Sequence, residues 1–192
     1  MIEKIINNKF ATVIFCITLY IILEIIGRTV FIWIPSEGKL QNLKILRDLF
    51  IIGGYILTLI NFGFINKNDF TINLKFLLPA TIAMVVFLYF CTESSGKKYP
   101  IYVLTEAFFM APIAEELICR KFLLESFLPK HLILGCIASM IFFIFFHFQT
   151  NISVLIFYFI IAFLLTVTQI KTKSIINSII LHSICNIMIY II

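Results

Sequence analysis

Two adjacent glutamates and an arginine lie inside an otherwise apolar stretch, PIAEELICRKFL at residues 112–123. Glu116 and Arg120 are four residues apart, so on a helix they share a face and can form an ion pair. Glu115 points about 100° away from Glu116, because each helical residue turns that far around the axis. The spacing therefore leaves Glu115 available for chemistry, and a buried carboxylate is suited to act as a general base.

Each of two later apolar stretches carries one histidine with a partner four residues away. FFIFFHF places Phe143 one helical turn before His147, and LHSICNIM places His182 one turn before Asn186. On helices, Phe143 can pack against the imidazole of His147 and orient it, while His182 and Asn186 present two donors on one face. The sequence thus predicts three polar clusters, one in each apolar stretch.

The composition predicts an integral membrane protein. Of the 192 residues, 61% are hydrophobic and 13% are charged, with 22 Phe, and the mean hydropathy is +1.08. A soluble domain of this length cannot bury so much apolar surface. The formal charge of +5 comes from Lys and Arg scattered through short loops, so it does not indicate a nucleic-acid partner.

Apolar runs long enough to cross a bilayer define the expected elements. Helices are expected because they satisfy their own backbone groups in lipid. The fold class is therefore an all-α polytopic bundle of about seven transmembrane helices. It is expected to form one domain, 1–192, with a four-helix core at 101–192 that carries the three clusters. The expected helices span 10–34, 49–65, 76–92, 102–127, 132–148, 154–170 and 174–192.

The depth of the polar residues is compatible with one shared site. A charge at the bilayer centre costs about 2.5–3.5 kcal/mol, so such residues normally face a protein interior and have a function. Counted from the turn at Pro129, Glu115 and His147 lie about 21 and 25 Å deep, and His182 lies about 15 Å from the same side. His182 joins the other two only if the helices tilt or if the helix ends differ from those expected. Glu106, nine residues before Glu115, can line the cavity or lie near the outer surface, and the surface position is favoured.

Loop charges predict the orientation in a bacterial cell membrane. With the N-terminus in the cytoplasm, eight loop Lys or Arg lie inside and five outside, and cytoplasmic loops collect positive charge. We therefore expect a cytoplasmic N-terminus and a C-terminus on the opposite side. The five cysteines show no CxxC pair and are interpreted as small apolar residues.

The ordered pattern EExxxR, FxxxH and HxxxN resembles the CAAX protease and bacteriocin-processing family of intramembrane peptidases, also called the Abi family. Here the motifs stand as Glu115-Glu116 to Arg120, Phe143 to His147, and His182 to Asn186. Each motif alone is weak, but the ordered set is specific. The resemblance covers about residues 101–192.

The resemblance implies a glutamate-dependent endopeptidase that cleaves a peptide or leader substrate near the membrane surface. Glu115 with His147 would activate a water, and His182 with Asn186 would stabilise the oxyanion. Glu116, Arg120 and Phe143 would organise the site. The relatives include the type II CAAX prenyl endopeptidase and proteins linked to bacteriocin maturation, peptide-signal processing and self-immunity.

Three alternatives remain open at this stage. Glu115, His147 and His182 have the ligand types of catalytic zinc, but metal-free catalysis without a cofactor is favoured, and no HExxH occurs. A non-catalytic bacteriocin-immunity protein of the same fold would keep the helices without the activity. A proton-coupled or metal transporter also places Glu and His in the membrane, but no repeat or broken-helix pair supports one.

Overall fold

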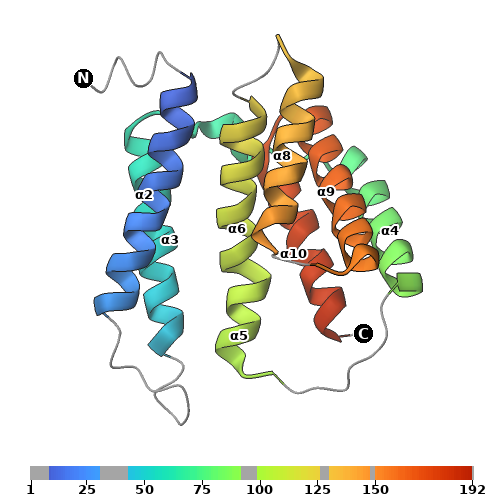
Figure 1. Cartoon of the computed structure of the whole chain (residues 1–192), viewed down its shortest axis with the longest axis horizontal. Coiled ribbons are helices and arrows are strands. Elements are labelled where there is room, and N and C mark those ends of the chain that lie inside the picture. The colour runs from blue at the N-terminus through green and yellow to red at the C-terminus, as the bar shows by residue number, and fades with distance from the viewer. Residues whose placement is uncertain (1–8, 31–42, 92–98, 126–129, 148–149, 192) are drawn as a thin grey trace.

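The computed structural model describes residues 9–30, 43–91, 99–125, 130–147 and 150–191 (Figure 1), and within these ranges it contains helices and no strand. The predicted all-α fold with seven helices is confirmed. Six of the helices are α2 (Lys9–Val30), α3 (Leu43–Asn61), α4 (Leu74–Cys91), α8 (Leu132–Phe146), α9 (Ile152–Thr172) and α10 (Ile175–Ile191). The seventh is continuous and comprises α5 (Ile101–Thr105), η3 (Glu106–Met110), α6 (Ala111–Glu116) and η4 (Leu117–Leu124); a 3₁₀ turn, η2, spans Lys67–Phe70.

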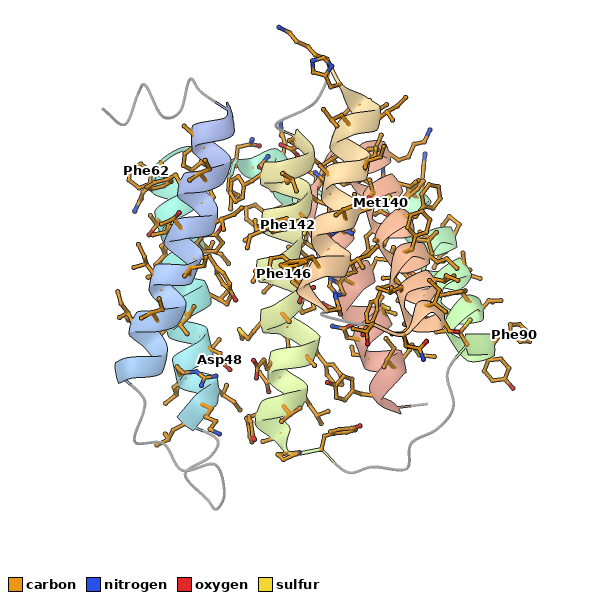
Figure 2. All side chains as sticks on the ribbon, in the orientation of Figure 1. Asp48, Phe62, Phe90, Met140, Phe142 and Phe146 are labelled. Atoms are coloured by element: carbon orange, nitrogen blue, oxygen red, sulfur yellow. The ribbon has the colours of Figure 1, made fainter. Side chains whose placement is uncertain are left out.

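The distribution of polar and apolar side chains is that of a membrane protein. Large apolar residues face outward, including Phe90 at 79% exposure on the outer edge of α4 (Figure 2) and Ile133 at 76%. Charged and polar side chains lie inside instead, with both Glu116 and Arg120 fully buried. Helices α4 and α9 are long and apolar enough to cross a membrane. The chain is therefore a polytopic membrane helix bundle.

One predicted helix starts earlier in the structure than in the sequence. Helix α3 begins at Leu43 rather than at residue 49, so Arg47 and Asp48 lie in its first two turns. The Nε of Arg47 donates to Oδ1 of Asp48 at 2.7 Å. Counting apolar residues misses such a start, because long basic side chains extend from a helix end toward the interface. At the end of α2, residues 31–34 of the predicted first segment lie outside the described residues.

Helix α10 is the element that joins the bundle together. It contacts α4 and α9 on one side and the helix formed by η3, α6 and η4 on the other, while α2 and α3 form a hairpin that packs against η4 and η3 (Figure 1). Apolar contacts among α4, α8, α9 and α10 form the larger core cluster, which includes Met84, Phe143 and Leu165. This arrangement brings the last helix of the chain against the glutamate-bearing one.

The start of α10 is covered by η2, and this accounts for the depth of His182. Ser174 is buried, and its hydroxyl donates to the backbone carbonyl of Asp69 at 2.8 Å. Asn177 in the first turn of α10 donates to the carbonyl of Thr71, also at 2.8 Å. The turn before α10 therefore lies beneath the end of the bundle, so a depth counted in residues from that turn underestimates how deep His182 lies.

The glutamate-bearing helix is widened on both sides of α6. Segments η3 and η4 are π-helical, and single π turns are frequent at functional sites. Pro112 at the start of α6 has no N–H to donate to the preceding turn, which accounts for the widened turn before it. The carbonyl of Ala107 in the widened turn accepts from Nδ2 of Asn186 at 2.7 Å. A side chain of α10 thus satisfies the backbone that the π turn leaves open.

Candidate active site

The four predicted catalytic residues line one cavity. Glu115 comes from α6, His147 from the end of α8, and His182 and Asn186 from α10, and together they face a space of about 310 Å³. Phe143 also lines this space. Residues separated by up to 71 positions in the sequence (115 to 186) are thus brought into one layer of the bundle.

The buried pair Glu116 and Arg120 forms as its spacing predicts. Nε of Arg120 and Oε2 of Glu116 lie 3.3 Å apart, and both side chains are completely buried. The contact is ionic rather than a directed hydrogen bond, since neither atom meets hydrogen-bond geometry. Arg120 also donates from Nη2 to the carbonyl of Ala162 at 3.2 Å. Its guanidinium is therefore held by one helix partner and by the backbone of α9.

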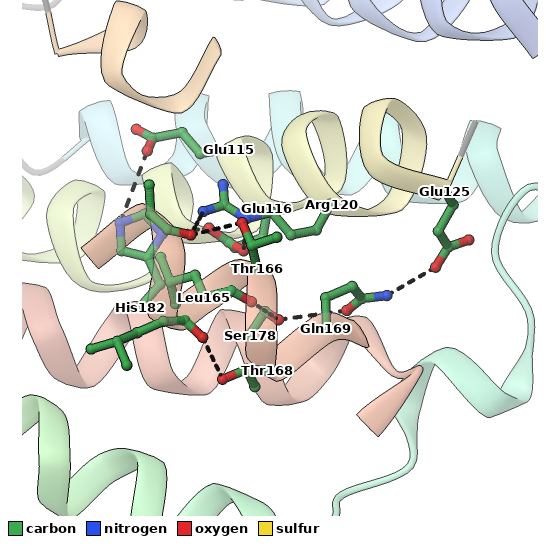
Figure 3. A network of polar contacts seen from close by, with 12 residues as sticks. Glu115, Glu116, Arg120, Glu125, Leu165, Thr166, Thr168, Gln169, Ser178 and His182 are labelled. Carbon is green, nitrogen blue, oxygen red and sulfur yellow. Dashed lines mark hydrogen bonds and ion pairs between the residues drawn. The ribbon is translucent and has the colours of Figure 1, made fainter. Parts of the chain in front are cut away.

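His182 connects the two glutamates (Figure 3). Its Nδ1 lies 3.0 Å from Oε1 of Glu116, and its Nε2 lies 3.9 Å from Oε2 of Glu115. A carboxylate paired with Arg120 accepts the proton of Nδ1–H, so the tautomer assigned from this network leaves Nε2 facing Glu115. The distance of 3.9 Å exceeds a hydrogen bond, but a water about 2.8 Å from each atom can bridge it.

His147 is held by its own helix and by two aromatic rings. Its Nδ1 lies 2.9 Å from the carbonyl of Phe143, so the second nitrogen, Nε2, stays available. The imidazole centroid is 4.9 Å from the ring of Phe143 and 4.0 Å from the ring of Tyr158 on α9. Tyr158 lines the same cavity. Sequence reasoning missed this residue, because a tyrosine in an apolar run reads as packing.

The ring of Phe143 contacts three side chains that can carry positive charge. The guanidinium carbon of Arg120 is 4.5 Å from its ring centroid. The imidazoles of His147 and His182 are 4.9 and 5.3 Å away, and the phenyl ring is completely buried. Phe143 therefore sets the spacing of three groups that can each carry positive charge, and its ring face attracts such charge.

Glu115 borders a second cavity as well as the first. This space of about 360 Å³ lies against the α2–α3 hairpin and is lined by Tyr20 and Asp48, with Glu106 and Glu115 from the central helix. The sequence favours a surface position for Glu106, whereas the structure places it in the lining of both cavities. Asp48, 7% exposed, was also missed. In the sequence, Asp48 is marked only by its position as a single acidic residue directly before the apolar run LFII.

The candidate ligands for a metal are distributed rather than clustered. Among the described residues, no group of three His, Cys, Asp or Glu side chains is placed to hold a metal ion. Nδ1 of His182 contacts Glu116, and Nδ1 of His147 contacts the backbone carbonyl of Phe143. Nε2 of each imidazole therefore remains available for contacts within the cavity.

The comparisons with known proteins agree with the arrangement of the motifs. Residues 97–188 match the family model described as type II CAAX prenyl endopeptidase Rce1-like, and all three motifs fall within this range. No curated protein and no solved structure matches the chain. The matched range begins just before α5 and ends within α10, so it covers every helix that contributes Glu115, His147, His182 and Asn186.

Proposed function

Because residues 97–188 match the family of type II CAAX prenyl endopeptidases of the Rce1-like kind, we propose that the protein is an intramembrane endopeptidase in which Glu115 activates water. The observation that carries the proposal is the single cavity shared by Glu115, His147, His182 and Asn186. The family assignment supplies the reaction class. The named roles rest on the contacts of each side chain.

In the first step, a water beside Glu115 attacks the carbonyl carbon of a peptide bond in the cavity. Glu115 takes one proton from the water as the new C–O bond forms, and the carbonyl electrons move to its oxygen. His147 assists by orienting the water through Nε2, because its Nδ1 is committed to the backbone. The two groups act from different helices, which fixes the water between them.

The oxyanion is stabilised from α10. Asn186 lines the cavity, and its amide nitrogen keeps a second proton after donating one to Ala107, so it can donate to an oxyanion. His182 donates from Nε2 when its imidazole is protonated, while its Nδ1 stays in contact with the Glu116 carboxylate 3.0 Å away. Removing one such donor from an enzyme typically costs about 10²–10³ in turnover.

Collapse of the tetrahedral intermediate completes the reaction. The carbonyl re-forms, the C–N bond breaks, and Glu115 gives the proton it received to the leaving nitrogen. The products are one new carboxyl group and one new amino group, so the water is fully accounted for. Glu115 returns to its ionised form and a second water can enter.

The substrate that fits this site is an extended peptide segment. Glu115 borders a cavity on each of two sides, which suits a chain that runs past it in both directions. Helices conceal their peptide bonds, so a cleavable bond must lie in extended chain. We propose a role in maturing a leader or signal peptide, or in self-immunity against a bacteriocin.

The proposal is tested with purified protein in lipid nanodiscs and a library of internally quenched peptides, with and without a prenyl group. Cleavage of any member, with products that carry a new carboxyl and a new amino end by mass spectrometry, supports an endopeptidase. If the wild-type protein cleaves nothing while it still protects cells against a bacteriocin, the non-catalytic immunity protein is the correct assignment.

We propose that the reaction needs no metal. Treatment with 1,10-phenanthroline and EDTA is expected to leave the turnover number unchanged, because Glu115 supplies the base and α10 supplies the charge stabilisation. Added zinc is expected to give no increase. A chelator-induced loss of turnover that zinc restores would instead establish a zinc peptidase with the same Glu and His residues.

We propose that the N-terminus lies in the cytoplasm and the C-terminus on the opposite side. The start of α2 and the end of α10 lie at opposite ends of the bundle (Figure 1), as seven crossings require. A fluorescent reporter that matures only in the cytoplasm should glow when fused before residue 1 and stay dark when fused after residue 192. The reverse pattern would invert the membrane orientation.

A further inference from the structure

Tyr158 makes a close ring contact with His147. Its ring centroid lies 4.0 Å from that of His147, with 36° between the planes, compared with 4.8 Å between the rings of Tyr99 and Tyr190. Both residues line the cavity that holds Glu115. A contact this close restricts rotation of the imidazole about its side-chain bonds.

His147 depends on side-chain contacts for its orientation. It caps the C-terminus of α8, where its backbone N–H still bonds to Ile144 and Phe145. The Nδ1 contact to the Phe143 carbonyl fixes one edge of the ring but leaves rotation about that contact. The rings of Phe143 on α8 and Tyr158 on α9 supply the remaining constraint.

We propose that Tyr158 is a positioning residue, whose ring holds the imidazole of His147 with Nε2 directed into the cavity. This inference rests on the proposed peptidase function for its kinetic consequence, but the geometry it describes is independent of any substrate. The hydroxyl of Tyr158 is not required.

The kinetic test separates the ring from the hydroxyl. Tyr158→Ala is expected to lower kcat by roughly 10- to 100-fold, because a displacement of about 1 Å in a catalytic group can cost 10²-fold, with KM little changed. Tyr158→Phe should stay within about threefold of wild type, since it keeps the ring. A matched control is Phe157→Ala: the neighbouring ring stacks on Phe87 with centroids 5.6 Å apart, and it does not line the cavity.

The structural test needs no substrate. The chain has three histidines, His131, His147 and His182, so the imidazole signals of histidine-labelled protein in nanodiscs can be assigned with His147→Gln. The carbon-bound protons of His147 should be shifted upfield by the Tyr158 ring. That shift should disappear in Tyr158→Ala and persist in Tyr158→Phe and in Phe157→Ala.

The kinetic and structural tests separate the proposed peptidase function from the positioning role of Tyr158. If no peptide is cleaved by wild type, the proposed function fails, and the proton shifts alone decide the position of Tyr158. The positioning role is overturned if Phe157→Ala lowers kcat as much as Tyr158→Ala, if Tyr158→Phe loses as much as Tyr158→Ala, or if the His147 shift is the same in all variants.

Discussion

Replacing Glu115 by glutamine is expected to lower the turnover number by about 10³-fold or more, because general-base catalysis contributes roughly 10²–10⁴. Glutamine keeps the size and hydrogen-bonding reach of the side chain but cannot accept a proton from water. The KM for the peptide should change little. The measurement is cleavage of the best library peptide by wild type and variant in the same nanodiscs.

Glu125→Gln is the matched control for this experiment. Glu125 lies in the contact network at the end of the bundle, where it accepts from Gln169 at 2.9 Å and pairs with Lys121 at 3.0 Å. It makes no part of either cavity beside Glu115. The turnover number of the Glu125→Gln variant should therefore stay near that of the wild type. Undiminished cleavage by the Glu115→Gln variant would refute the assigned role of Glu115.

The second large effect is on stability. Arg120→Met is expected to lower the free energy of unfolding by about 3–5 kcal/mol, because removing one partner leaves the other charge buried without compensation. Glu116 is completely buried, and of its ionic partners among the described residues this variant leaves His182 alone. Methionine fills much of the space that Arg120 occupies over the Phe143 ring. The loss of unfolding free energy therefore reflects the missing charge more than the missing side-chain volume. Denaturant titration in detergent, followed by circular dichroism, measures it.

A double variant tests the electrostatic origin of this loss. Glu116→Gln combined with Arg120→Met removes both charges and should be more stable than Arg120→Met alone. Lys171→Met removes an exposed cation on α9 and should change stability by less than about 0.5 kcal/mol. Equal losses in the single and double variants would show that packing around Arg120, rather than the buried pair, stabilises the bundle.

The sequence predicts the helices and the three clusters well because both depend on short-range rules. Apolar runs mark the spans, and spacing of four residues places Glu116 near Arg120 and Phe143 near His147 in the structure. These relations follow from one helix at a time. The assignment of catalytic roles to the clustered residues stays a prediction.

The rest of the candidate site depends on contacts between helices. Tyr158 gains its role only where α9 passes the end of α8, and Asp48 reaches the second cavity only because the α2–α3 hairpin packs against the central helix. No pattern within either segment distinguishes these residues from ordinary packing or interfacial ones. The depth of His182 likewise depends on η2, which covers the turn before α10.

The π turn at Glu106–Met110 makes the length of this segment as important as its composition. A π turn holds one residue more than an α turn, so deleting a single residue there would let the helix wind regularly. Because the extra residue is accommodated within one turn, everything after the deletion would keep nearly the same orientation relative to α5. When related chains are aligned, a one-residue gap at this point should mark proteins in which the acid keeps its orientation but the turn no longer leaves open the backbone carbonyl that Asn186 satisfies.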